Sequence, residues 1–172
     1  MSVWLNETEY RESDAASIGL AVNVAFLQEI KEDNVEFREL VDQCRTHFAA
    51  VSGSERNHPV ESARLLGLLR DEMKTYFALE EFFGYIENAE MKNPKLSREA
   101  SGLTGEHEEL FVELNSIVNS VEEVVYRECN ADTAFDDAVE AFQWFMKKLQ
   151  RHEDREMELM MRLHNEEIGV GD

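Results

Sequence analysis

Residues 145–163, FMKKLQRHEDREMELMMRL, show the clearest helical periodicity in the chain. One helical face is formed by residues spaced alternately by four and three positions: Phe145, Leu149, His152, Glu156, Leu159 and Leu163. Such spacing predicts an α-helix that turns one face toward a core. Two polar residues, four positions apart, therefore interrupt a stripe whose other members are apolar.

Three segments upstream show the same periodicity, with the turn-forming residues falling between them. We expect four helices, over residues 15–50, 60–88, 101–129 and 134–165. The sequence contains only 8 Gly and 2 Pro, which is typical of a helical protein. Long helices with short connections predict an all-α fold, an up-down-up-down antiparallel four-helix bundle.

Length and charge narrow the class of protein. The 172 residues predict a single domain over 1–172, with an N-terminal arm at 1–14 and a C-terminal tail at 166–172. A formal net charge of −20 repels phosphate backbones and anionic lipids, so we expect no nucleic-acid partner and no membrane partner. Cys44 and Cys129 form no CxxC or Cys/His motif, and no signal peptide is evident. These features favour a cytoplasmic protein and leave its oligomeric state open.

Polar residues interrupt the core stripes of the other predicted helices as well. The first stripe contains Asn34 and the third contains His107. The second contains Tyr76 and Glu80, four residues apart, in the same ring-then-acid order as the pair on the fourth helix. This repeat predicts two related helical hairpins.

These acids and imidazoles predict a metal site. A carboxylate buried without a partner is costly, and no Lys or Arg lies on the four stripes, so the two acids require protons, other cations or a metal ion. Imidazole nitrogen and carboxylate oxygen are ligands of iron and of first-row divalent metals. We expect the metal ligands to be Glu80, His107, His152 and Glu156. The alternative is a core network in which the same groups satisfy one another.

Tyr76 and Asn34 are weaker candidates, expected beside the ligands rather than among them. We expect the Tyr76 hydroxyl to hydrogen-bond a neighbour such as Glu80 or Asn34 rather than to bind metal as a phenolate. Asn34 is expected in a buried polar network, where its carbonyl oxygen could also bind a hard metal ion or hold a water molecule.

The order of these motifs along the chain, with GEHEEL at 105–110 and LQRHEDRE at 149–156, resembles the hemerythrin-like (HHE) cation-binding domain family. The resemblance spans residues 20–163. It implies a four-helix bundle that holds a carboxylate-bridged pair of iron ions. On this resemblance Glu80 and Glu156 match the bridging carboxylates, and His107 and His152 match terminal ligands.

This chain departs from the family pattern at three positions. Asn34 stands where the family has a histidine on its first helix, and Tyr76 stands where it has one on the second. Leu103 stands where some members carry a second histidine on the third helix. The resemblance therefore implies an incomplete or altered di-metal site.

Three kinds of function are compatible with these patterns. The first is an iron-binding protein that binds, stores or senses iron or dioxygen, with a metal ion and dioxygen or another small ligand as partners. Its iron would be mononuclear or dinuclear, and Zn or Mn also suits the ligands. The second is a metal-free, apo helical scaffold or interaction protein with a degenerate site. The third is an enzyme with an open metal position, but the sequence shows no distinct catalytic base and no phosphate-binding loop, so we expect a binding protein.

Overall fold

The computed structural model describes residues 19–52, 58–88, 93–126 and 131–169, and its long elements are all helical. The helices are α1 (Val24–Asp33), α2 (Val35–Val51), α3 (Pro59–Leu79), α4 (Pro94–Tyr126) and α5 (Ala131–Gly169). The predicted helical class is confirmed. None of the described helices combines the length and the hydrophobicity that a membrane span requires.

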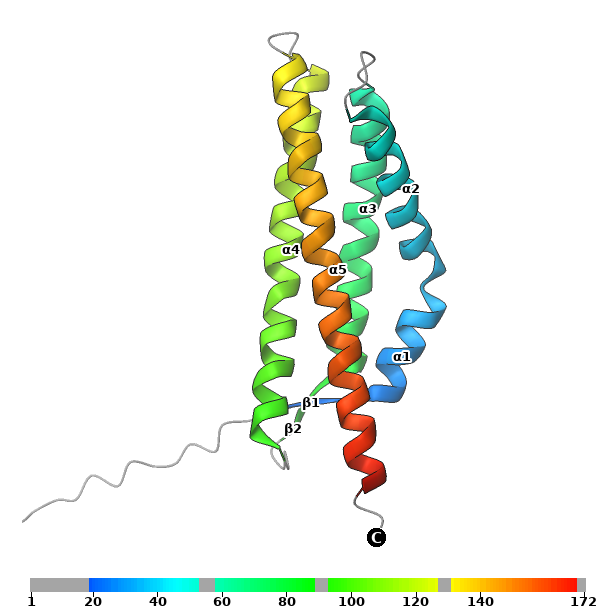
Figure 1. Cartoon of the computed structure of the whole chain (residues 1–172), viewed down its shortest axis with the longest axis vertical. Coiled ribbons are helices and arrows are strands. Elements are labelled where there is room, and N and C mark those ends of the chain that lie inside the picture. The colour runs from blue at the N-terminus through cyan, green and yellow to red at the C-terminus, as the bar shows by residue number, and fades with distance from the viewer. Residues whose placement is uncertain (1–18, 53–57, 89–92, 127–130, 170–172) are drawn as a thin grey trace, which may run out of the picture.

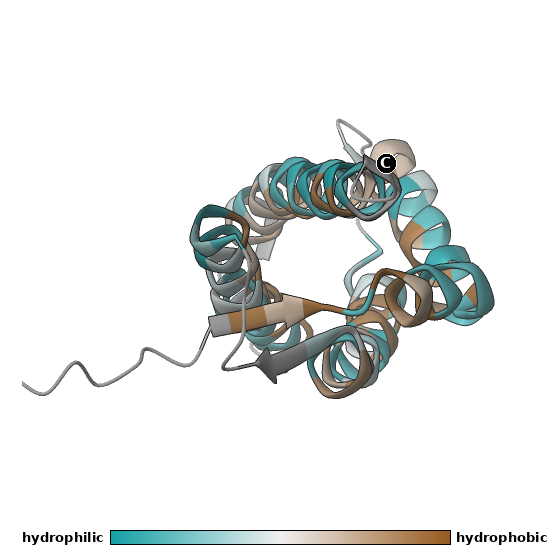
Figure 2. Cartoon of the chain, turned by 90° about the horizontal axis from the view of Figure 1, so that it is seen from below, coloured by the Kyte–Doolittle hydropathy of each residue, from teal (hydrophilic) through white to brown (hydrophobic). Residues whose placement is uncertain are grey.

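Helices α2 to α5 lie side by side, and the chain direction alternates from each of these four to the next, while α1 precedes α2 in the same direction (Figure 1). Helix α4 packs against both α3 and α5, and α2 packs against α3 and α5. Seen along the long axis, the helices surround a common centre, and β1 (Gly19–Val22) and β2 (Tyr85–Asn88) cross one end (Figure 2). Side chains that point inward from different helices can therefore meet.

The first predicted helix, 15–50, is wrong at its start and in its middle. Residues 19–22 form the strand β1, and the helix breaks at Asn34 into α1 and α2. The amide of Asn34 donates to the carbonyl oxygen of Ile30, while its side-chain Oδ1 accepts from the amide of Phe37. A single asparagine thus ends one helix and caps the next, which is a favoured role for this residue type. Residues 15–18 lie outside the described part of the chain.

The second predicted helix, 60–88, also ends early. Regular α-helix stops at Leu79 and is followed by a π-helical turn, η1 (Glu80–Gly84), and then by β2. The strands pair antiparallel, with Val22 opposite Tyr85. Gly84 permits the tight approach at this point, because a Cβ there would lie 2.8 Å from Cδ1 of Leu27. The sequence patterns missed both strands because four residues are too few to show a period.

The last two helices are longer than predicted. Helix α4 begins at Pro94 rather than at residue 101, because the side chain of Asn93 accepts from the amides of Lys95 and Leu96 and proline suits a first helical turn. Helix α5 extends from Ala131 to Gly169, so residues 166–169 are helical rather than part of a tail. Residues 1–14, 127–129 and 170–172 lie outside the described ranges.

The core consists of two clusters of buried apolar side chains, and helices α4 and α5 contribute buried side chains to both. On α4, Leu110 belongs to the larger cluster and Leu103 to the smaller one. On α5, Leu149 and Leu159 are divided in the same way. Cys44 is a buried free thiol within the larger cluster. The four predicted ligands, Glu80, His107, His152 and Glu156, lie between the two clusters, whereas Tyr76 belongs to the larger one.

Candidate metal centre

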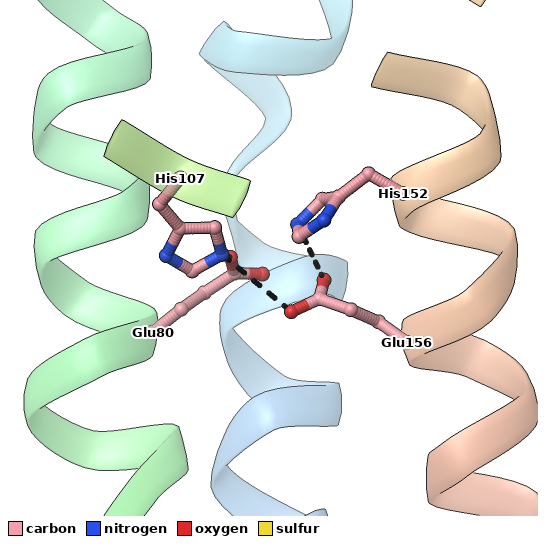
Figure 3. Close-up of side chains that lie close together, drawn as sticks. All are labelled: Glu80, His107, His152 and Glu156. Atoms are coloured by element: carbon pink, nitrogen blue, oxygen red, sulfur yellow. Dashed lines mark ion pairs between the residues drawn. The ribbon is translucent and has the colours of Figure 1, made fainter. Parts of the chain in front are cut away.

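Four side chains from three elements converge between the two apolar clusters (Figure 3). Glu80 is the first residue of η1, His107 comes from α4, and His152 and Glu156 come from consecutive turns of α5. One ligand atom from each lies within 4.8 Å of the others, and at most 2% of any of the four residues is exposed. The structure therefore brings together all four predicted ligands in a group that could hold a metal ion.

Carboxylates on the far side of each imidazole fix its orientation. Nδ1 of His107 lies 2.9 Å from Oε1 of Glu81, and Nδ1 of His152 lies 3.1 Å from Oε2 of Glu106. A neutral imidazole that donates from Nδ1 presents an unprotonated Nε2, and such backing is usual for metal-binding histidines. The Phe77 ring stacks on His107 with centroids 4.1 Å apart. Both Nε2 atoms are thereby aimed at Glu156, and that of His107 also at Glu80.

Two consecutive acids of the π-helical turn contact opposite edges of the His107 ring. Oε2 of Glu80 lies 3.5 Å from Nε2 of His107, while Glu81 contacts Nδ1 on the opposite edge of the same ring. π-Helical turns of this kind often occur at functional sites. The sequence could have drawn attention to Glu81 and Glu106 only through their positions next to predicted ligands.

Three buried polar atoms of the cluster have no hydrogen-bond partner among the described residues: Oε2 of Glu80, Nε2 of His107 and Nε2 of His152. Nε2 of His107 lies 3.7 Å from Oε1 of Glu156, and Nε2 of His152 lies 3.6 Å from Oε2 of the same acid. Two ligand atoms that bind one ion at about 2.0–2.2 Å are roughly 3–3.5 Å apart, depending on the coordination angle. The observed separations are longer than hydrogen bonds but close to those of ligands that share an ion.

Lys31 was not predicted at this site, although it supplies one of the cations that the buried acids were expected to require. Its Nζ lies 2.9 Å from Oε1 of Glu80, 2.7 Å from Oε2 of Glu156 and 2.7 Å from Oε2 of Glu153. It also donates to the Tyr76 hydroxyl at 2.9 Å. The first predicted core stripe runs through Leu27, Ile30 and Asn34, and Lys31 does not belong to it. A long side chain next to a core position can still extend its charged end toward buried groups, which the spacing of core residues does not show.

The other residues singled out in the sequence have different roles from those expected. The Tyr76 hydroxyl contacts Lys31 and Glu153 rather than Glu80 or Asn34, and the Tyr76 ring stacks on Phe37. Asn34 uses its side-chain oxygen to cap α2, so it is not part of the expected network with Tyr76.

Two further residues complete the surroundings of the cluster. Leu103 is fully buried in the smaller apolar cluster. The Tyr85 hydroxyl donates to Oε1 of Glu156. Tyr85 was not predicted at the site, because the sequence pattern places it inside a continuous helix, whereas Tyr85 begins β2.

Burial and charge set the protonation states within the cluster. Burial and the neighbouring Glu156 raise the pKa of Glu80 to about 7. Burial also disfavours the Glu156 carboxylate, but His107, Lys31 and His152 outweigh it and lower its pKa to about 2. Burial lowers the pKa of His152, which keeps that imidazole neutral at pH 7. Burial opposes charge on His107 as well, but the carboxylates of Glu156, Glu80 and Glu81 outweigh it and raise the pKa of this imidazole. Burial opposes the charge on Lys31 too, but the surrounding carboxylates raise its pKa and keep it an ammonium.

Comparison of the chain with protein-family models, with curated proteins and with solved structures finds no match.

Proposed function

We propose that this chain is a hemerythrin-like metal-binding protein that holds an ion between Glu80, His107, His152 and Glu156. The main support for the proposal is that three buried polar atoms without hydrogen-bond partners lie close together: Oε2 of Glu80, Nε2 of His107 and Nε2 of His152. Leaving such atoms unpaired costs about 1–3 kcal/mol each. An ion that accepts all three lone pairs removes this cost, whereas rearranged hydrogen bonds would have to form among groups held 3.5 Å or more apart.

Iron is the ion we favour for this ligand set. Two imidazole nitrogens and two carboxylate oxygens form a mixed set that suits iron, with manganese and zinc as the next candidates. The alternating helices support the hemerythrin-like four-helix bundle that the motif order suggests. Four protein ligands leave positions on a six-coordinate ion for water or a small ligand such as dioxygen. The residues of this chain would supply the ligand orientation and the enclosure by hydrocarbon.

Metal titration of the purified protein tests the proposal. After the protein is stripped with chelator, Fe²⁺ is added without oxygen, and bound metal and melting temperature are measured. An ion that binds only the native state stabilises it by about 2.7 kcal/mol when its free concentration is a hundredfold above Kd. At about 2–4 °C per kcal/mol for a chain of this size, the melting temperature should rise by roughly 5–10 °C.

The double variant His107→Ala/His152→Ala should lose both the bound ion and the thermal shift. The matched control is His58→Ala/His164→Ala, because both side chains are exposed and that of His58 makes no capping hydrogen bond. Equal metal binding by the first variant and the control would refute the assignment, since it would place the ion on the acidic surface.

A second candidate, a metal-free scaffold, is favoured by the ammonium of Lys31. This group offsets charge on Glu80 and Glu156 without any ion, so the buried acids are already partly compensated. The Lys31 ammonium does not pair with Nε2 of His107 or of His152, and for this reason we rank metal binding first. The scaffold predicts that chelator leaves the melting temperature of the purified protein unchanged and that added metal ions do not raise it.

A further inference from the structure

The ammonium of Lys31 lies in a cage of oxygen atoms next to the proposed metal position. Four oxygens surround Nζ at 2.7–2.9 Å: Oη of Tyr76, Oε1 of Glu80, Oε2 of Glu153 and Oε2 of Glu156. The Lys31 side chain is only 10% exposed. An ammonium has three hydrogens to donate, so four close oxygens exceed what its hydrogen bonds alone require.

Both buried carboxylates lie between the ammonium and the imidazoles. Glu80 turns Oε1 to Lys31 and Oε2 to His107. Glu156 turns Oε2 to Lys31, and its Oε1 lies nearer to His107. Each acid thus faces two cation positions, one of nitrogen and oxygen ligands and one of oxygens alone. Carboxylates that face two positions in this way are what a pair of neighbouring metal ions requires.

We propose that the Lys31 ammonium takes the place of a second metal ion and limits the centre to one. Removal of the ammonium would open a cation site formed by Tyr76, Glu80, Glu153 and Glu156. An all-oxygen set of this kind suits a hard divalent ion such as Mn²⁺ or Mg²⁺. The inference rests on the proposed metal binding at the four-residue cluster. It adds that one side chain, Lys31, determines how many metal ions the centre holds.

The location of Lys31 gives such an ion a route from solvent. Lys31, Tyr76 and Glu153 line a surface pocket of about 620 Å³ between the N-terminal helices and α5. The four proposed ligands of the first ion do not line this pocket. Substitution of Lys31 by a shorter or neutral side chain therefore changes the wall that separates the pocket from the buried acids.

Mn²⁺ binding by the wild type, Lys31→Met and Lys31→Arg tests the inference. Methionine keeps an unbranched side chain without charge, whereas arginine keeps the charge. Lys148→Met is the matched control, because it removes a lysine from an exposed ion pair with Glu113. Bound Mn²⁺ is counted by equilibrium dialysis and elemental analysis, and paired ions are recognised by their exchange-coupled electron paramagnetic resonance spectrum.

We expect Lys31→Met to bind one more Mn²⁺ than the wild type, and Lys31→Arg and Lys148→Met to bind no more. The added ion should disappear in Lys31→Met/Glu153→Gln, because Glu153 belongs to the oxygen cage and not to the first site. With both positions filled, the spectrum should be exchange-coupled. No added ion in Lys31→Met, or an added ion that survives the loss of the Glu153 carboxylate, would overturn the inference.

The two proposals fail in different ways. A wild type that binds no ion would refute the proposed function, while the difference between Lys31→Met and the wild type would still decide the role of Lys31. Should Lys31→Met not fold alone, folding is measured with Mn²⁺ present. Folding that Mn²⁺ restores supports the inference, and a variant that stays unfolded with Mn²⁺ contradicts it.

Discussion

Removal of the carboxylate behind His152 should weaken metal binding without removing a ligand. Oε2 of Glu106 accepts from Nδ1 of His152 at 3.1 Å, and hydrogen bonds to charged groups contribute about 1.5–3 kcal/mol. At about 1.4 kcal/mol per tenfold in Kd, complete loss would weaken binding by roughly 10- to 150-fold. Glu106 is 30% exposed and shares its charge with Arg155, so we place the Glu106→Ala effect in the lower part of this range, at about 10- to 30-fold.

Competition with a chelator of known affinity measures this change in Kd. Glu109→Ala is the matched control, because it removes the same charge from an exposed position on the same helix. The control should change Kd less than twofold if the effect is local, since surface charges are largely screened at physiological salt. Equal Kd values for Glu106→Ala and Glu109→Ala would show that the hydrogen bond between Glu106 and Nδ1 of His152 contributes nothing to metal affinity.

Three further changes test the fold around the site. Asn34→Ala should lower the free energy of unfolding by about 1 kcal/mol, because it removes the cap of α2. The number of bound metal ions should not change, and a change would show that Asn34 takes part in metal binding. Burial raises the pKa of the Cys44 thiol to about 12, above its value near 8.5 in the unfolded chain. The unfolded state therefore binds fewer protons between these values, so denaturant titrations should show stability falling with rising pH more steeply than in Cys44→Ala. Gly84→Ala should cost about 1–3 kcal/mol in thermal unfolding, because its Cβ would meet buried Leu27, and an unchanged melting temperature would argue against that close approach.

The sequence was sufficient for the features that depend on helical periodicity. The stripes on α4 and α5 place His107, His152 and Glu156 on inward faces because these helices are long and continuous. Glu80 was also placed correctly, since α3 remains regular up to the residue before it. Each of these four positions could be derived from spacing and from the cost of burying a polar group.

Periodicity failed where the backbone departs from a regular helix. The break at Asn34 depends on a side-chain cap, and the strand that begins at Tyr85 depends on pairing with residues far away in the sequence. Lys31 was missed for a related reason. Its ammonium contacts the buried acids from α1, a short helix separated from α2. A pattern of buried positions does not reveal a long polar side chain of which only the charged end lies near the core.

An anomalous X-ray map of crystals grown with Fe²⁺ under anaerobic conditions would locate the ion directly. We predict one strong peak bonded to Nε2 of His107 and Nε2 of His152 at about 2.0–2.2 Å, with Glu80 and Glu156 supplying oxygens and Lys31 still beside them. No peak between the two Nε2 atoms, with metal found only on surface acids, would contradict it.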